Sequence, residues 1–114
     1  MPRARNSLAL NPLQLRTLTL LQELARHAGH ASPASDPKEV IVSNIPHPHG
    51  DHFHVGPYLV RAGDATGLGI EGAWKALERK GLAKSMYPLA ILLTEAGLAY
   101  DTGLREAILL GADH

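Results

Sequence analysis

Four histidines and one aspartate lie close together in the middle of the chain, in the segment HPHGDHFH at residues 47–54. Imidazole nitrogens and carboxylate oxygens are ligands that zinc, iron, nickel and manganese accept. This density of nitrogen and oxygen donors makes the segment a candidate metal site. The candidate ligands are His47, His49, Asp51, His52 and His54, and the metal they would take is a divalent transition metal such as zinc.

The same string resembles the HxHxDH signature of metallo-β-lactamase-fold hydrolases, which His47, His49, Asp51 and His52 match after an apolar stretch. The resemblance implies one metal on the first two histidines and a second metal on the aspartate and the third histidine. That fold is much longer than this chain, and its site needs two further histidines and a bridging aspartate downstream. Only His114 follows the segment. We therefore interpret the match as coincidental and predict no enzymatic activity.

Two interpretations of these histidines without catalysis stay open. In an extended segment, His52 and His54 would share one side, opposite Phe53. The two earlier histidines could join them across a turn at Gly50, which would make a regulatory or structural metal site. The alternative is that the imidazoles bind backbone carbonyls or a second copy of the chain, where their near-neutral pKa would allow a pH-sensitive interface.

A second set of candidate residues is basic and lies within residues 75–84. Lysine and arginine side chains on one face of a helix can read base edges in the major groove of double-stranded DNA and bind its phosphates. Glu71 and Glu78 belong to the same predicted helix and would be repelled by phosphate, so its outer face carries both signs of charge. The candidate DNA-binding residues are Lys75, Arg79, Lys80 and Lys84, the last in a predicted hairpin.

The helix that carries these residues is predicted by its periodicity. Apolar residues recur at the i, i+3, i+4, i+7 spacing from Ile70 to Leu77, which indicates one buried face that includes Trp74. Gly81 can adopt a positive φ without steric cost, and such a residue commonly follows the end of a helix. The helix is therefore expected to end at about Lys80.

Residues 82–94 predict two short strands around a turn near Pro88, and Thr94 can cap a further helix. The expected arrangement consists of a helix that ends in LERKGL, a short hairpin and a further helix that begins in LTEAGLAY. This arrangement resembles the second half of a winged helix-turn-helix domain of small bacterial regulators. The resemblance implies an α+β, winged-helix-like fold with three or more helices and a small antiparallel sheet. It also implies DNA binding and transcription regulation, although winged helices serve as protein-interaction modules too.

The N-terminal part of the chain predicts an arm and then a helix. Residues 1–10 lack apolar periodicity and are expected to be a flexible arm. Asn11 is a good N-cap, Pro12 suits the first helical position, and Gln14 stands three residues after the cap as in a capping box. Apolar residues then recur at helical spacing to Ala28.

Residues 31–37 are predicted to be a loop, and residues 39–45, rich in β-branched side chains, a strand that completes a small sheet with the hairpin. The segment 55–68 admits two interpretations. It forms either a short helix, the first of a helix-turn-helix, or a strand over residues 53–62 that pairs with residues 39–45. We favour the strand and a tight turn, which would make the helix-turn-helix degenerate.

Residues 95–110 are predicted to form the last helix, with more apolar surface than a small domain is expected to cover. We therefore expect a homodimer through this helix, whose twofold symmetry would suit paired half-sites on DNA. Residues 111–114 are expected to be a tail. The single domain would then span residues 11–110.

Composition bounds these hypotheses. The chain of 114 residues has 11 basic and 11 acidic residues, so its formal net charge is zero. DNA-binding proteins usually carry a basic footprint, so DNA contact here would depend on a local patch. The absence of cysteine excludes disulfides and thiolate metal sites. No apolar run is long enough for a membrane span, and we expect a cytoplasmic protein. The sequence thus leaves a DNA-binding regulator, a protein-interaction module and a metal-responsive domain as candidate functions.

Overall fold

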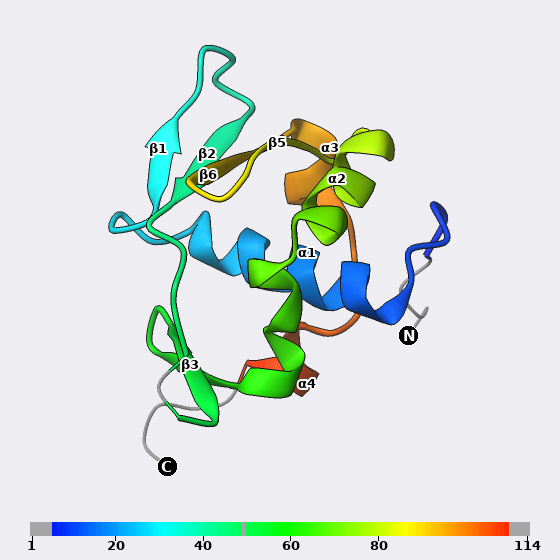
Figure 1. Cartoon of the computed structure of the whole chain (residues 1–114). Helices are drawn as coiled ribbons and strands as arrows, with labels where there is room; N and C mark the ends of the chain where they lie inside the picture. Colours follow the sequence, from blue (N-terminus) through cyan, green and yellow to red (C-terminus); the bar gives the residue numbers. More distant parts are fainter. Residues whose placement is uncertain (1–5, 49, 110–114) are drawn as a thin grey trace.

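Helix α1 (Pro12–Leu24) crosses the middle of the molecule, and the other elements are arranged around it (Figure 1). The structure is a computed structural model that describes residues 6–48 and 50–109. These residues form an α+β fold, as expected, with short helices and an antiparallel sheet. No helix in this described part is long and apolar enough to cross a membrane.

The start of α1 is as predicted, and its end is not. The Asn11 side chain accepts a hydrogen bond from the Gln14 amide at 2.8 Å, and the Gln14 side chain accepts one from the Asn11 amide at 3.0 Å. The helix ends at Leu24 rather than at Ala28. Beyond it the amides of residues 26 and 27 bond to carbonyls three residues back, because the last turn tightens towards 3₁₀ geometry.

Four strands form a sheet in the order β1-β2-β6-β5, and each pairs antiparallel with its neighbours. The predicted strand within residues 39–45 is β2 (Val40–Ser43), and it lies beside β6 (Ala90–Leu93) of the predicted hairpin. The hairpin's first strand is β5 (Ala83–Met86). We predicted a loop at residues 31–37, but Ala31–Pro33 forms strand β1. The Ala-Ser-Pro sequence of β1 does not favour a strand by itself; the strand forms because it pairs with the free edge of β2.

A separate hairpin consists of β3 (His52–Val55) and β4 (Tyr58–Arg61). The segment is therefore extended rather than helical, as we favoured, but it forms two strands joined by a turn at residues 56–57 and not one strand over residues 53–62. Its pairing is also corrected, because β4 pairs with β3 and not with residues 39–45. Two 3₁₀ helices follow in place of the tight turn that we predicted, η1 (Ala62–Asp64) and η2 (Thr66–Gly69). They occupy the place where a helix-turn-helix would have its first helix, since the glycines here disfavour an α-helix.

Helix α2 (Glu71–Arg79) matches the predicted helix. Gly81 has a φ of +77°, and the Leu82 amide donates to the Leu77 carbonyl at 3.0 Å, which closes the helix. Trp74 and Leu77 are fully buried. They belong to a core that also contains α1 and sheet residues: Leu18, Leu21, Leu24, Val42, Ile91 and Leu93.

The single helix predicted over residues 95–110 is wrong. The chain forms α3 (Glu95–Ala99), which Thr94 caps as predicted, and then α4 (Arg105–Ile108). Between them the Asp101 carboxylate accepts from the Gly103 amide at 3.0 Å, and Gly103 has a φ of +73°, which is incompatible with a continuous helix. The apolar side chains of this part pack on the chain's own core, so the stripe on which we based the homodimer is absent. Dimerisation itself stays a prediction, and residues 111–114 lie outside the described part.

The N-terminal arm is shorter than we predicted. The Tyr100 hydroxyl donates to the Asn6 side chain at 2.6 Å and accepts from the Leu8 amide at 3.1 Å. Leu10 is buried. Residues 6–10 are therefore attached to the domain, because their leucines reach its core; residues 1–5 lie outside the described part.

Candidate functional site

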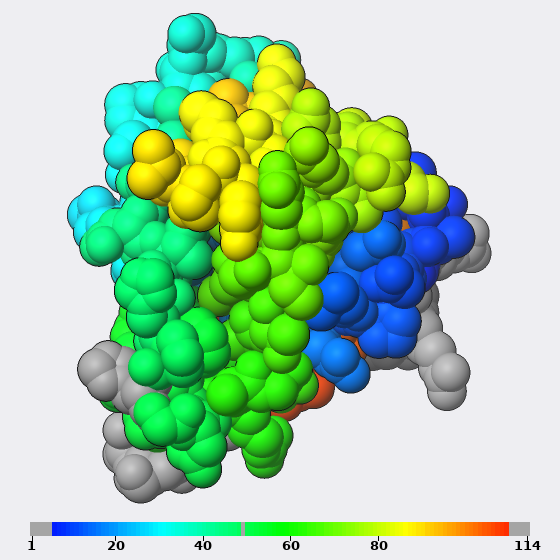
Figure 2. All heavy atoms as spheres, in the orientation of Figure 1, coloured from blue at the N-terminus to red at the C-terminus, as the bar shows by residue number. Residues whose placement is uncertain are grey.

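The candidate DNA-binding residues lie on α2, at its C-cap Lys80 and on the adjacent strand β5. The Ser85 amide donates to the Glu78 carboxylate at 2.9 Å, which holds the strand against the helix. The atoms of α2 and of the β5–β6 hairpin lie side by side on one face of the molecule (Figure 2). All four predicted residues are exposed, and we refer to them as the basic face: Lys75, Arg79, Lys80 and Lys84.

The charge on this face is locally positive although the whole chain is neutral. Lys75 pairs with Glu71 at 3.5 Å between exposed side chains, as their i,i+4 spacing favours. Glu78 is engaged by the strand backbone. Arg79, Lys80 and Lys84 form no ion pair with any residue that the structure describes. The second half of α2 and the start of β5 therefore offer three cations to a negatively charged partner.

The hairpin tip is fixed to the start of α2. The Tyr87 hydroxyl donates to the Gly69 carbonyl at 2.8 Å, and its ring meets Trp74 edge to face with centroids 4.9 Å apart. The Trp74 indole nitrogen donates to the Gly67 carbonyl at 3.2 Å. These contacts hold hairpin and helix in one arrangement. Leu89, at the tip, is 79% exposed.

The predicted alternation in the histidine segment is confirmed. Phe53 is buried, while the rings of His52 and His54 lie with centroids 5.0 Å apart. His52 Nδ1 lies 3.4 Å from the carboxylate of Asp51. His47 is exposed and lines a pocket of about 210 Å³ that is mainly apolar.

A metal site is a separate question. Within residues 6–48 and 50–109, no three His, Asp or Glu side chains form a group that could hold a metal ion. His49 and His114 lie outside these ranges. Metal binding by the segment therefore stays a prediction.

One polar cluster was not predicted. Glu23 lies among the leucines of α1, its side chain is 3% exposed, and its carboxylate binds Arg105 of α4 and, at 2.6 Å, His27 Nε2. Burial alone would raise the pKa of Glu23, but the hydrogen bonds and charges of Arg105 and His27 lower it below its ordinary value. The hydrogen bond with Glu23 in turn raises the pKa of Arg105. The i,i+4 spacing of Glu23 and His27 could have predicted their contact from the sequence. Nothing in the sequence near Arg105 indicates that it pairs with Glu23.

The β3–β4 hairpin also packs on this cluster. A Cβ atom on Gly56, whose φ is +57°, would overlap the His27 ring, so only glycine allows this close approach. The Tyr58 ring lies under the Arg105 guanidinium, 5.7 Å from centroid to Cζ. Glu23, His27, Tyr58 and Arg105 thus join α1, the hairpin and α4.

Comparison with known proteins adds no assignment. A scan against models of protein families and searches of curated proteins and of solved structures found no match.

Proposed function

We propose that this chain is a winged-helix-like regulator that binds double-stranded DNA through α2 and the β5–β6 hairpin. The order of elements supports the winged-helix assignment: β6 pairs with both β2 and β5, and α2 directly precedes the hairpin. Helix α2 has nine residues and is therefore about 13 Å long. A helix enters the major groove, which is about 12 Å wide, by one exposed face.

The observation that carries the proposal is the basic face. Arg79, Lys80 and Lys84 are exposed, lie on adjoining elements and have no carboxylate partner in the described ranges. Phosphate neutralisation by such side chains releases counterions, and this supplies most of the sequence-independent affinity for DNA. A neutral chain can bind DNA in this way because the field near a surface depends on its local charges.

Filter binding of a mixed-sequence duplex at several salt concentrations tests the proposal. With about three phosphate contacts, the logarithm of the association constant should fall with log salt at a slope of about −3. Lys80→Glu should weaken binding at least about tenfold, since it turns an attraction into a repulsion.

Lys38→Glu is the matched control, because it makes the same charge change in the loop between β1 and β2, away from the edge strand β5. Circular dichroism of both variants would verify their folding. Absence of salt-dependent binding by the wild type, or equal weakening by the two variants, would refute the proposal.

A protein-interaction module is the second candidate, and the exposed apolar side chains around the hairpin favour it. Leu89, Met86 and Ile70 are large and exposed. Apolar groups gathered on one surface are typical of protein contacts. On this hypothesis the duplex would not bind even at low salt.

A further inference from the structure

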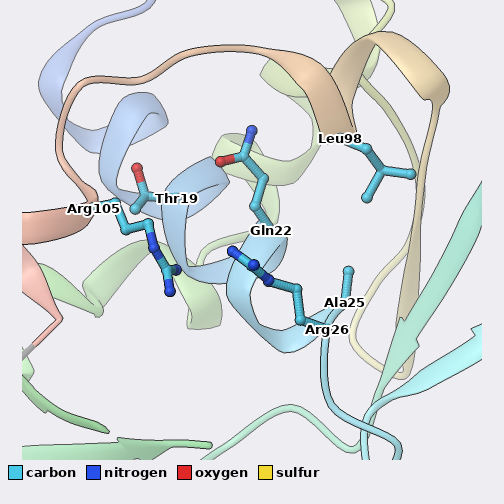
Figure 3. A pocket seen from close by; sticks show the side chains of 6 residues that line it. All are labelled: Thr19, Gln22, Ala25, Arg26, Leu98 and Arg105. Atoms are coloured by element: carbon cyan, nitrogen blue, oxygen red, sulfur yellow. The ribbon is translucent and has the colours of Figure 1, made fainter.

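A pocket of about 260 Å³ lies between α1, α3 and the start of α4 (Figure 3). Two arginines from different elements extend towards each other in it, and the Gln22 side chain extends away from their guanidinium groups. Ala25 and Leu98 form an apolar side. The complete lining is Thr19, Gln22, Ala25, Arg26, Leu98 and Arg105.

Arg105 is held in position before any ligand arrives. Glu23 binds one terminal nitrogen of its guanidinium, and the other lies 3.5 Å from the Tyr58 hydroxyl. The side chain is nevertheless 45% exposed, so its remaining donors can reach the pocket. A guanidinium fixed in this way loses little conformational entropy when it binds an anion.

Arg26 supplies the unbalanced charge. Its guanidinium forms no ion pair and no side-chain hydrogen bond with any residue in the described part of the chain. Glu23 pairs with Arg105 and His27 but not with Arg26, so the charge of Arg26 leaves the pocket positive. The Gln22 amide nitrogen already donates to the carbonyls of Gly97 and Tyr100, at 2.8 and 2.7 Å. The two arginines are therefore the donors that an anion would meet.

We propose that this pocket binds a small organic monocarboxylate, with its carboxylate between Arg26 and Arg105 and a compact apolar body against Ala25 and Leu98. Arginine pairs with carboxylates through parallel hydrogen bonds, which gives the recognition its geometry. The volume is just below the roughly 300 Å³ at which drug-sized ligand pockets begin, which suits a single ring or a short chain. The site does not depend on DNA binding.

The test is a titration of the full chain with benzoate, followed by NMR through the amide signals of Thr19, Ala25 and Leu98. Saturable shifts are expected with benzoate. Benzamide has nearly the same shape without the charge and should bind at least about fivefold more weakly, since charge-assisted hydrogen bonds are about twice as strong as neutral ones.

Arg26→Gln should weaken benzoate binding at least about fivefold, because it removes one charge-assisted partner. This variant is preferred to one at Arg105, since Arg26 holds no other side chain in place. Arg16→Gln is the matched control. Arg16 lies on α1, pairs with Asp64 at 3.6 Å and does not line the pocket, so benzoate affinity should be unchanged in this variant.

Three results would overturn the inference: no saturable shift with benzoate, equal affinity in Arg26→Gln and wild type, or equal affinity for benzamide. Inorganic phosphate is the remaining probe, and affinity equal to that of benzoate would refute the role of the apolar body. No DNA is present in this titration, so its failure and a failure of the DNA-binding proposal are distinguishable.

Discussion

Glu23 and Arg105 lie 82 positions apart in the chain, and they form an ion pair that joins α1 to α4. The two partners differ in their access to water, since the Glu23 side chain is 3% exposed and that of Arg105 is 45% exposed. The carboxylate has lost its hydration and depends on its protein partners. Removal of each partner should therefore cost a different free energy.

We expect Arg105→Ala to destabilise the fold more than Glu23→Gln. The first leaves a buried carboxylate with His27 as its remaining partner, which costs about 3 kcal/mol. The second removes the charge and keeps a group that can hydrogen-bond, at a cost of about 1 to 2 kcal/mol. Urea unfolding followed by circular dichroism would measure both. A larger loss of unfolding free energy in Glu23→Gln than in Arg105→Ala would contradict this prediction.

The same cluster should make the free energy of unfolding depend on pH in acid. Its hydrogen bonds and ion pairs lower the pKa of Glu23 in the folded chain below the ordinary value of 4.5, despite the opposing effect of burial. The unfolded chain thus takes up this proton first as pH falls, so the stabilisation is complete above about pH 4.5 and is lost as pH falls through the folded pKa. Urea midpoints measured from about pH 6 to about pH 3 should fall less steeply in Glu23→Gln. If the urea midpoints of Glu23→Gln and wild type fell equally with pH, Glu23 would not be the source of the acid dependence.

Gly97 and Gly72 should respond oppositely to the same substitution. Gly97 of α3 packs directly on Leu82, and an added Cβ would overlap its carbonyl oxygen. Gly97→Ala is expected to cost about 2 to 3 kcal/mol, because backbone must move. At Gly72 of α2 an added Cβ would meet open space, so Gly72→Ala should raise the free energy of unfolding by about 0.5 to 1 kcal/mol. Thermal unfolding would compare them, and a neutral Gly97→Ala would show that α3 does not need this close packing.

If the basic face binds DNA, loss of Glu71 should strengthen binding. Its carboxylate lies 3.5 Å from the Lys75 ammonium. In the proposed complex it would also face the phosphates of the duplex. Glu71→Gln would release Lys75 and remove the repulsion, and we expect a two- to fivefold gain in affinity, on the order of 0.5 to 1 kcal/mol. Glu106→Gln makes the same charge change at an exposed position of α4 and serves as the control. Filter binding at constant salt would compare them, and equal gains would assign the effect to net charge alone.

The sequence predicted those elements whose signals are local. The capping box at Asn11, the glycine after α2 and the cap at Thr94 each involve residues within a few positions of one another, so their types and spacing are sufficient evidence. The Asp-Thr-Gly string at residues 101–103 was also a usable turn signal, but the apolar periodicity around it led us to predict one helix. Strand β1 and the partner of Glu23 could not be predicted, because each depends on a contact with a distant part of the chain.

Trp74 is the only tryptophan of the chain, and it lies where η2, α2 and the hairpin meet. The intrinsic fluorescence of the protein therefore reports on this one junction. A hairpin that detached from α2 would take the Tyr87 ring away from the indole and admit water, and the emission would shift to longer wavelength. The molecule thus carries its own optical reporter of whether its two proposed DNA-contacting elements stay together.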